Sequence, residues 1–291
     1  MESYRQRLKF VTAAVLFGTN GIVAAHISLS SAETVLLRTM LGSLFLAAAV
    51  VLTGRFDFAA LKRDAAAATL GGAALGLNWV LLFAAYRETS VSMATLIYNC
   101  GPMLVLALSP ILFGERLTRG KLAAVAAVTA GLLCISGSID LHTRAAGFLL
   151  AGGAALFYAA MIVCNKRVTA LSGLHCALYE VIVSFVVVLA YVLFTGGRVP
   201  VPVAAGEWAP VLWLGIVNTG VTYYLYFSSM QKLPGQTVSL LCYLDPLTAL
   251  VLSALLLHER LAPVQILGAA LILGGALLGD APFVRRRLFS H

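Results

Sequence analysis

Long apolar stretches alternate with short polar connections along the whole chain. Each stretch holds about 18 to 24 mostly apolar residues, the length at which an α-helix crosses the hydrocarbon core of a bilayer. The stretches lie near 8–27, 32–53, 65–86, 90–113, 119–138, 145–168, 173–195, 208–229, 235–257 and 262–279. The pattern predicts an all-α integral membrane protein with ten transmembrane helices and no separate soluble domain.

The sequence also contains an internal repeat. A gapless shift of 144 residues carries Glu115-Arg116-Leu117 onto Glu259-Arg260-Leu261, and the same shift carries Pro102 onto Pro246. Because leucine matches mean little in so apolar a chain, the comparison rests on these rarer residues. It predicts two five-helix repeats, residues 1–144 and 145–291.

Composition points to lipid as the solvent of this chain. Hydrophobic residues make up 60% of it and charged residues 11%, whereas a soluble domain carries about 25% charged residues. The net charge is +8, but the basic residues lie at the ends of the apolar stretches, so binding to nucleic acid is not expected. The five cysteines form no C-x-x-C pair, and we expect no metal or other cofactor.

The basic residues also predict the orientation in the membrane. If the N-terminus is cytoplasmic, 15 of the 20 Lys and Arg residues fall on the cytoplasmic side and four on the other, with Arg38 inside the second span. Both termini are then cytoplasmic. Because each repeat has an odd number of helices, the second enters the membrane from the opposite side. Inverted repeats of this kind are typical of secondary transporters.

Polar and aromatic side chains within the spans mark the candidate binding site, because polar groups in lipid are costly and usually face the protein interior. The candidate substrate-binding residues are Asn20, Asn78, Trp79, Thr95, Tyr98, Asn99, Tyr158, Thr222, Tyr223, Tyr243 and Asp245. Aromatic residues also anchor helices at the lipid–water interface, so a site is one of two interpretations for the tyrosines. A cavity with aromatic walls and a few amides suits an aromatic amino acid or an organic cation.

Two prolines are hinge candidates. Pro102 and Pro246 occupy matching positions in the two repeats, and each leaves a backbone carbonyl, near residues 98 and 242, without a helical donor. Free carbonyls at membrane depth are tolerated where they are buried or line a cavity. We expect the two prolines to bend their helices around a central site, with an ordinary packing kink as the alternative.

The charges within the spans allow several roles. Asp245 could bind a substrate amine, carry a coupling proton, or serve as a buried hydrogen-bonded carboxylate. Glu180 and Arg38 could form an internal pair, or Arg38 could extend toward the membrane surface. For Glu115 and Glu259, at helix ends, capping and helix–helix salt bridges are the default interpretation.

Several short motifs are similar to those of a known family. Phe17-Gly18-Thr19-Asn20 is similar to its Trp-Gly-Ser/Thr-Asn element, Arg38 matches its helix-2 arginine, and residues 114–117 and 258–261 match its Glu-Arg-Leu helix ends. On these residues, and over essentially its whole length, the chain resembles the drug/metabolite transporter superfamily in its EamA-like branch. The resemblance implies a basket of helices 1–4 and 6–9 around a central cavity, with helices 5 and 10 outside it.

Pattern and resemblance together predict a secondary transporter, an alternating-access exporter of small metabolites. Amino acids, including aromatic ones, are the favoured substrates, in line with the aromatic amino acid exporters of the superfamily. The alternatives are a carrier for organic cations, drugs or choline-like substrates, and a non-carrier channel or scramblase. No protease or zinc-enzyme motif occurs, so no enzymatic activity is expected. The expected setting is the bacterial cytoplasmic (inner) membrane, with a small-molecule substrate and membrane lipid as partners, in a monomer or weak homodimer.

Overall fold

A computed structural model of the 291-residue chain describes residues 2–24, 26–54, 56–88, 91–116, 118–136, 145–196, 205–256 and 262–279. Every element of regular structure in these ranges is a helix, which confirms the all-α class. The elements are α1 (Glu2–Gly18), α2 (Asn20–Ala24), α3 (Ser31–Thr53), α4 (Phe58–Glu88), α5 (Val91–Tyr98), α6 (Cys100–Phe113), α7 (Arg119–Ser136), α8 (Ala145–Arg167), α9 (Gly173–Phe194), η1 (Ala205–Glu207), α10 (Trp208–Leu212), the π-helical η2 (Trp213–Val221), α11 (Thr222–Met230), α12 (Gly235–Leu241), α13 (Leu244–Leu256) and α14 (Pro263–Gly279).

Six segments of the described chain are long and apolar enough to cross a membrane. They are Glu2–Ala24, Ala32–Thr53, Phe58–Ala85, Ala145–Arg167, Gly173–Phe194 and Gly235–Leu256. The shorter apolar helices Cys100–Phe113 and Pro263–Ala276 lie within two further predicted spans. The structure therefore supports a multi-span helical protein but identifies fewer spans than the ten predicted from the apolar pattern.

Several predicted spans contain a helix break, and the break in the fourth accounts for part of this difference, since the first and the ninth remain among the six. The first predicted span divides at Thr19, where α1 ends and α2 begins, and the fourth divides at Asn99 between α5 and α6. The ninth divides between α12 and α13, three to four residues before Pro246. Proline removes a hydrogen-bond donor and clashes with the carbonyl four residues earlier, so a break just before Pro102 or Pro246 is expected. Whether these breaks act as hinges stays a prediction.

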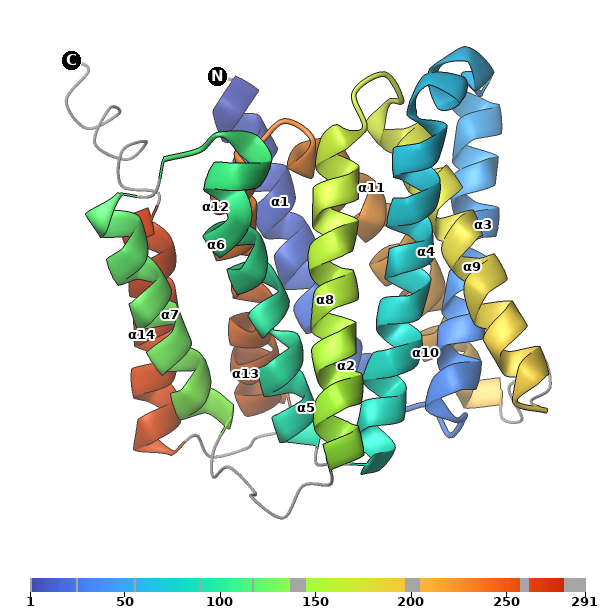
Figure 1. The fold of residues 1–291 in the computed structure, drawn as a ribbon. Helices are drawn as coiled ribbons and strands as arrows, with labels where there is room; N and C mark the ends of the chain where they lie inside the picture. Colours follow the sequence, from blue (N-terminus) through green and yellow to red (C-terminus); the bar gives the residue numbers. More distant parts are fainter. Residues whose placement is uncertain are drawn as a thin grey trace.

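The main contacts between helices follow the internal repeat (Figure 1). For each of the following pairs, the helices at the positions shifted by 144 residues also pack together. α4 packs against α8, and α11, at the corresponding place in the second half, packs against α1. α6 packs against α8, and its counterpart α13 packs against α1. α3 with α9, and α7 with α14, each join a helix to its own counterpart. The division near residue 144 itself lies outside the described residues, as does Glu259-Arg260-Leu261, and stays a prediction.

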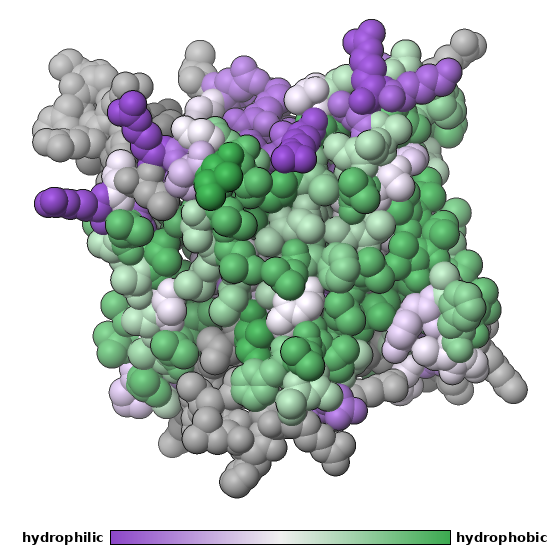
Figure 2. Space-filling view, viewed as in Figure 1, coloured by the Kyte–Doolittle hydropathy of each residue, from purple (hydrophilic) through white to green (hydrophobic). Residues whose placement is uncertain are grey.

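The outer surface is apolar around the middle of the bundle. Figure 2 shows a hydrophobic band with hydrophilic side chains gathered at the upper end, where α1 begins in Figure 1 with the charged residues Arg5, Arg7 and Lys9. Large apolar side chains such as Leu52, Ile111 and Phe194 are more than 80% exposed. Exposed apolar surface on this scale fits a lipid environment. We call the charged end, where α1 begins, the basic end.

Carboxylate–backbone hydrogen bonds tie the two halves together at the basic end. Asp64 of α4 accepts from the backbone N–H groups of residues 169, 170 and 171, in the turn between α8 and α9, at 2.7 to 3.0 Å. Glu115, after α6, accepts from the N–H groups of Gly235 and Gln236 at the start of α12, at 2.6 and 3.0 Å. We call these contacts the Asp64 clamp and the Glu115 clamp. At the opposite end, Glu207 accepts one N–H, that of Ser28, at 3.3 Å.

Candidate functional site

A cavity lies between helices of both halves at the centre of the bundle. It is lined by Phe17, Asn20, Arg38, Leu75, Asn78, Trp79, Tyr98, Tyr158, Met161, Tyr223, Tyr226 and Asp245. These residues come from α1, α2, α3, α4, α5, α8, α11 and α13. None of these helices could form the cavity alone, so it depends on the packing of the two halves.

Seven of the eleven candidate binding residues line this cavity. They are Asn20, Asn78, Trp79, Tyr98, Tyr158, Tyr223 and Asp245. The other four, Thr95, Asn99, Thr222 and Tyr243, are not among its lining residues. Phe17, Arg38, Leu75, Met161 and Tyr226 line it without having been among the candidates.

Three of the four residues away from the cavity donate side-chain hydrogen bonds to backbone carbonyls of the helices. The hydroxyl group of Tyr243 donates to the backbone carbonyl of Asn99 at 2.8 Å, across the helix break there. The side-chain amide of Asn99 donates to the carbonyl of Thr95 at 2.9 Å. Thr222 donates to the carbonyl of Val217 at 2.8 Å. The bond from Tyr243 joins the break between α12 and α13 to the break between α5 and α6. The carbonyls of Thr95 and Val217 also accept backbone N–H groups, those of Asn99 and Thr222, so these side chains add a second donor within their own helices.

Arg38 is the main lining residue that was not among the candidates. Its side chain is buried, its Nε donates to the hydroxyl of Thr219 at 3.0 Å, and its guanidinium lies 4.9 Å from the centre of the Trp79 ring. Neither arrangement considered from the sequence, a pair with Glu180 or an extension toward the membrane surface, is observed. A single arginine inside an apolar span was the signal for a functional residue.

Asp245 faces the same cavity as Arg38. It lies in the first turn of α13, where the helix dipole stabilises a negative charge. Within the described part of the chain, Asp245 and Arg38 do not form an ion pair with each other. A positive and a negative group therefore border one space and stay separated.

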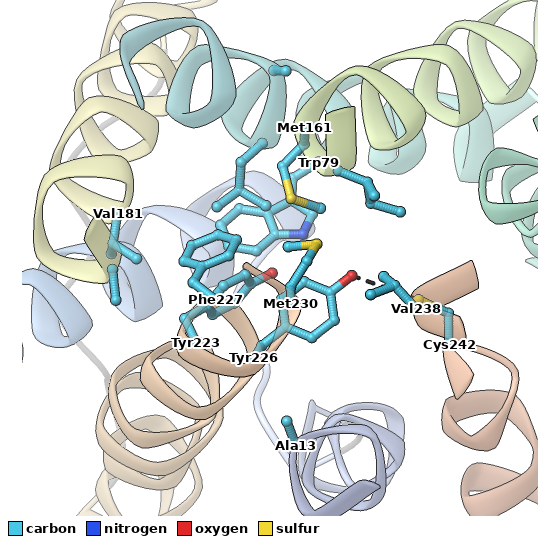
Figure 3. Packing of buried hydrophobic residues seen from close by; sticks show 14 of the residues in the cluster. Ala13, Trp79, Met161, Val181, Tyr223, Tyr226, Phe227, Met230, Val238 and Cys242 are labelled. Atoms are coloured by element: carbon cyan, nitrogen blue, oxygen red, sulfur yellow. Dashed lines mark hydrogen bonds between the residues drawn. The ribbon is translucent and has the colours of Figure 1, made fainter. Parts of the chain in front are cut away.

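Aromatic rings form much of the remaining wall. Tyr98 and Tyr158 stack at 4.9 Å with nearly parallel planes, 6° apart. Phe17 and Trp79 both meet the ring of Tyr223 edge-on, at 5.0 and 5.6 Å. Figure 3 shows Trp79, Met161 and Tyr223 gathered between the helices. Such packed rings give a rigid, amphipathic wall.

The asparagines connect the cavity to the helix break in the first span. Asn218 of η2 donates from its side-chain amide to Asn20 at 2.7 Å, to Thr19 at 3.0 Å and to the backbone carbonyl of Leu16 at 3.2 Å. Asn78 donates to the carbonyl of Ala154 on α8 at 2.7 Å. These bonds fix α2 and α4 against helices of the other half.

An apolar outer band, a bundle of long helices and a buried cavity with polar and aromatic walls define a multi-pass membrane transport protein. Comparison with known sequences agrees: the model of the EamA-like transporter family matches residues 8–137 and again 145–278. The chain belongs to this family, within the drug/metabolite transporter superfamily.

Individual proteins related to the chain include named transporters and a protein with a solved structure. The chain is 30% identical over 276 residues to the uncharacterized transporter YxxF of Bacillus subtilis, covering 93% of this chain and 88% of that protein. It is 27% identical over 222 residues to a probable amino-acid metabolite efflux pump of Salmonella typhimurium, covering 72% and 74%. A crystal structure of a protein that is 22% identical superimposes with a TM-score of 0.83 over 98% of this chain and 99% of the other, which shows a shared fold.

Proposed function

We propose that the protein is a secondary transporter that exports amino acids with apolar or aromatic side chains by alternating access. The observation that carries this proposal is the placement of Arg38 and Asp245 on one cavity without a direct ion pair. An amino acid has a carboxylate and an ammonium group on the same carbon. It would place the carboxylate against Arg38 and the ammonium group against Asp245.

The aromatic wall supports an apolar side chain as the third feature of the substrate. The stacked pair of Tyr98 and Tyr158 and the edge-on group around Tyr223 offer ring faces and edges to a bound ring. The match to a probable amino-acid metabolite efflux pump supports the same class of substrate and the export direction.

The proposed architecture has ten transmembrane helices in two inverted repeats, with the basic end cytoplasmic. The exchange of helix contacts by the 144-residue shift and the family match in each half support the repeats. The orientation is supported by the Lys and Arg residues at the basic end, among them Arg5 and Lys9 near the start of α1 and Lys166 and Arg167 in the last turn of α8. At that end the two clamps join the halves through hydrogen bonds.

Counterflow in liposomes tests the proposal. Purified protein is reconstituted in vesicles preloaded with tryptophan, alanine or choline, and uptake of the labelled compound is followed. We expect saturable exchange of tryptophan. Tryptamine, which lacks the carboxylate, and indole-3-propionate, which lacks the amine, should each compete roughly 10- to 100-fold more weakly, because a charge-assisted hydrogen bond contributes about 1.5–3 kcal/mol.

Two results would contradict the assignment. Exchange of choline without exchange of tryptophan would indicate an organic cation carrier that uses Asp245 and the tyrosines, with Arg38 in a structural role. Flux that rises linearly with concentration and is not reduced by unlabelled tryptophan would indicate a channel.

A further inference from the structure

A second buried carboxyl group lies outside the substrate cavity. Glu180 of α9 is fully buried, and its Oε1 accepts from the side-chain amide of Asn165 on α8 at 3.0 Å and from the thiol of Cys176 at 3.3 Å. The backbone of α4 covers it from the other side: a Cβ atom at Gly71 would lie 3.1 Å from both carboxyl oxygens. The group is thus enclosed where three helices meet.

Two atoms in this cluster lack a partner, and both are oxygens. Oε2 of Glu180 and Oδ1 of Asn165 are buried without a hydrogen bond. Buried polar atoms are nearly always bonded, so two neighbouring exceptions require a cause. An ionised carboxylate and an amide oxygen are both acceptors and cannot bond to each other. A proton on Oε2 supplies the missing donor, and the acid and the amide can then join through two parallel hydrogen bonds.

The surroundings also favour the neutral acid. The titratable groups around Glu180 are Cys176 on α9, Cys164 on α8 and Tyr223 on α11, all uncharged in their ordinary form. α4 presents backbone at Gly71, and α3 keeps Arg38 at the substrate cavity. Within the described residues no Lys or Arg bonds to the Glu180 carboxyl. A buried carboxylate without a cation costs several kcal/mol, and protonation removes that cost.

The site lies one helical turn from the substrate cavity. Leu75 and Met161 line the cavity, and each is four residues from a contact of Glu180, namely Gly71 on α4 and Asn165 on α8. On the other side, the Asp64 clamp holds the turn between α8 and α9 against α4. Movement at the basic end that opens this clamp would also separate the helices around Glu180.

We propose that Glu180 is a proton-binding site that couples transport to the proton gradient. The proton reaches the carboxylate through the cavity while the basic end is closed, and the neutral acid allows α4, α8 and α9 to pack as observed. When the basic end opens, the acid releases the proton to water there and becomes a carboxylate. The substrate-loaded carrier then closes with the carboxylate ionised, and the empty carrier closes with the acid neutral, so one proton moves inward for each substrate moved outward. The coupling rests on the proposed transport function, whereas the protonation does not.

Infrared difference spectroscopy tests the protonation without any substrate. The spectrum of the wild type minus that of Glu180→Gln at neutral pH should contain the carbonyl band of a protonated carboxylic acid, and the band should shift in D₂O. Gln is close in shape to the neutral acid, so the variant should fold. Glu2→Gln removes an exposed carboxylate, 74% exposed and paired with Lys232, and should show no such band. Absence of the band for Glu180 would overturn the proposal.

Transport then tests the coupling. A gradient of one pH unit drives at most a roughly tenfold accumulation of tryptophan for one proton per substrate. Glu180→Gln should lose this accumulation and retain counterflow, because a permanently neutral side chain cannot release a proton. Gradient-driven accumulation at the wild-type level in Glu180→Gln would show that the acid is only structural and would overturn the coupling. If neither protein moves tryptophan, the substrate assignment fails and the infrared result still decides the protonation state.

Discussion

At the scale of single residues, the proposed recognition of an amino acid depends most on Arg38, the positive group on the cavity wall. We expect Arg38→Gln to raise the KM for tryptophan counterflow roughly 10- to 100-fold, because a buried charge-assisted hydrogen bond to the carboxylate is lost. Arg38→Lys should restore only part of the affinity, since an ammonium group lacks the planar fork of guanidinium.

The matched control is Arg63→Gln, which removes an exposed charge at the basic end. Its KM should stay at the wild-type value. The weak competition by tryptamine should be unchanged in Arg38→Gln, because tryptamine has no carboxylate to lose a partner. An equal loss for tryptophan and tryptamine would show that Arg38 acts by shaping the cavity.

Sequence reasoning predicted the deep tyrosines and asparagines of the cavity but could not sort them from polar residues that serve the helices. Tyr98 and Tyr243 lie in equally apolar stretches, yet one lines the cavity and the other bonds to a carbonyl at a helix break. Either placement keeps the tyrosine hydroxyl group away from lipid, so the sequence pattern alone does not distinguish a cavity residue from one that bonds to the backbone. Leu75 and Met161 carry no polar signal at all, and packing alone brings them to the cavity.

At the scale of helices, small residues set how closely α4 and α9 approach. A Cβ atom at Gly72 would lie 2.7 Å from the backbone oxygen of Glu180. We therefore expect Gly72→Ala to lower the stability of the protein by about 1–3 kcal/mol, as overpacking does. The thermal unfolding midpoint in detergent measures the effect.

Gly152→Ala on α8 is the matched control, since a Cβ atom there would meet nothing within 4 Å. It should leave stability unchanged or raise it by up to about 1 kcal/mol, because Ala is the better helix former. Equal midpoints for the two variants would contradict the close α4–α9 contact.

The positions of the helices were predictable from apolar length, whereas their internal breaks were only partly so. The break at Asn99 follows from Pro102, three residues later. The break at Thr19 has no proline. The carbonyl of Leu16 there accepts from the backbone N–H and the hydroxyl of Thr19, and also from the side-chain amide of Asn218, some 200 residues away. The bond from Asn218 forms only in the folded protein, because the two residues are far apart in the sequence, so no local sequence pattern predicts it.

At the scale of the whole molecule, the two clamps join the halves at the basic end, and in the proposed alternating-access cycle they would have to open there. We expect Glu115→Gln to weaken the bonds to the N–H groups of Gly235 and Gln236 and to shift the population toward a form open at the basic end by roughly tenfold, because bonds to a charged group are the stronger ones. Hydrogen–deuterium exchange at the start of α12 should become correspondingly faster.

Glu33→Gln serves as the control for this variant. Glu33 lies at the opposite end, where its carboxylate caps α3 by accepting the N–H of Ser30 at 2.9 Å. Its loss should speed exchange at the start of α3 and leave α12 unchanged. Unchanged exchange at α12 in Glu115→Gln would show that the clamp does not control that end.

The chemistry of the Asp64 clamp has a practical consequence for reporter design. Its three donors are main-chain N–H groups, so the side chains of Thr169 and Ala170 take no part in it and point to solvent. Any residue except proline keeps those donors. A fluorophore attached at Ala170 can therefore sit directly beside the contact without altering its chemistry. A contact of this type also leaves no covariation between partners, so alignment-based contact maps would overlook it.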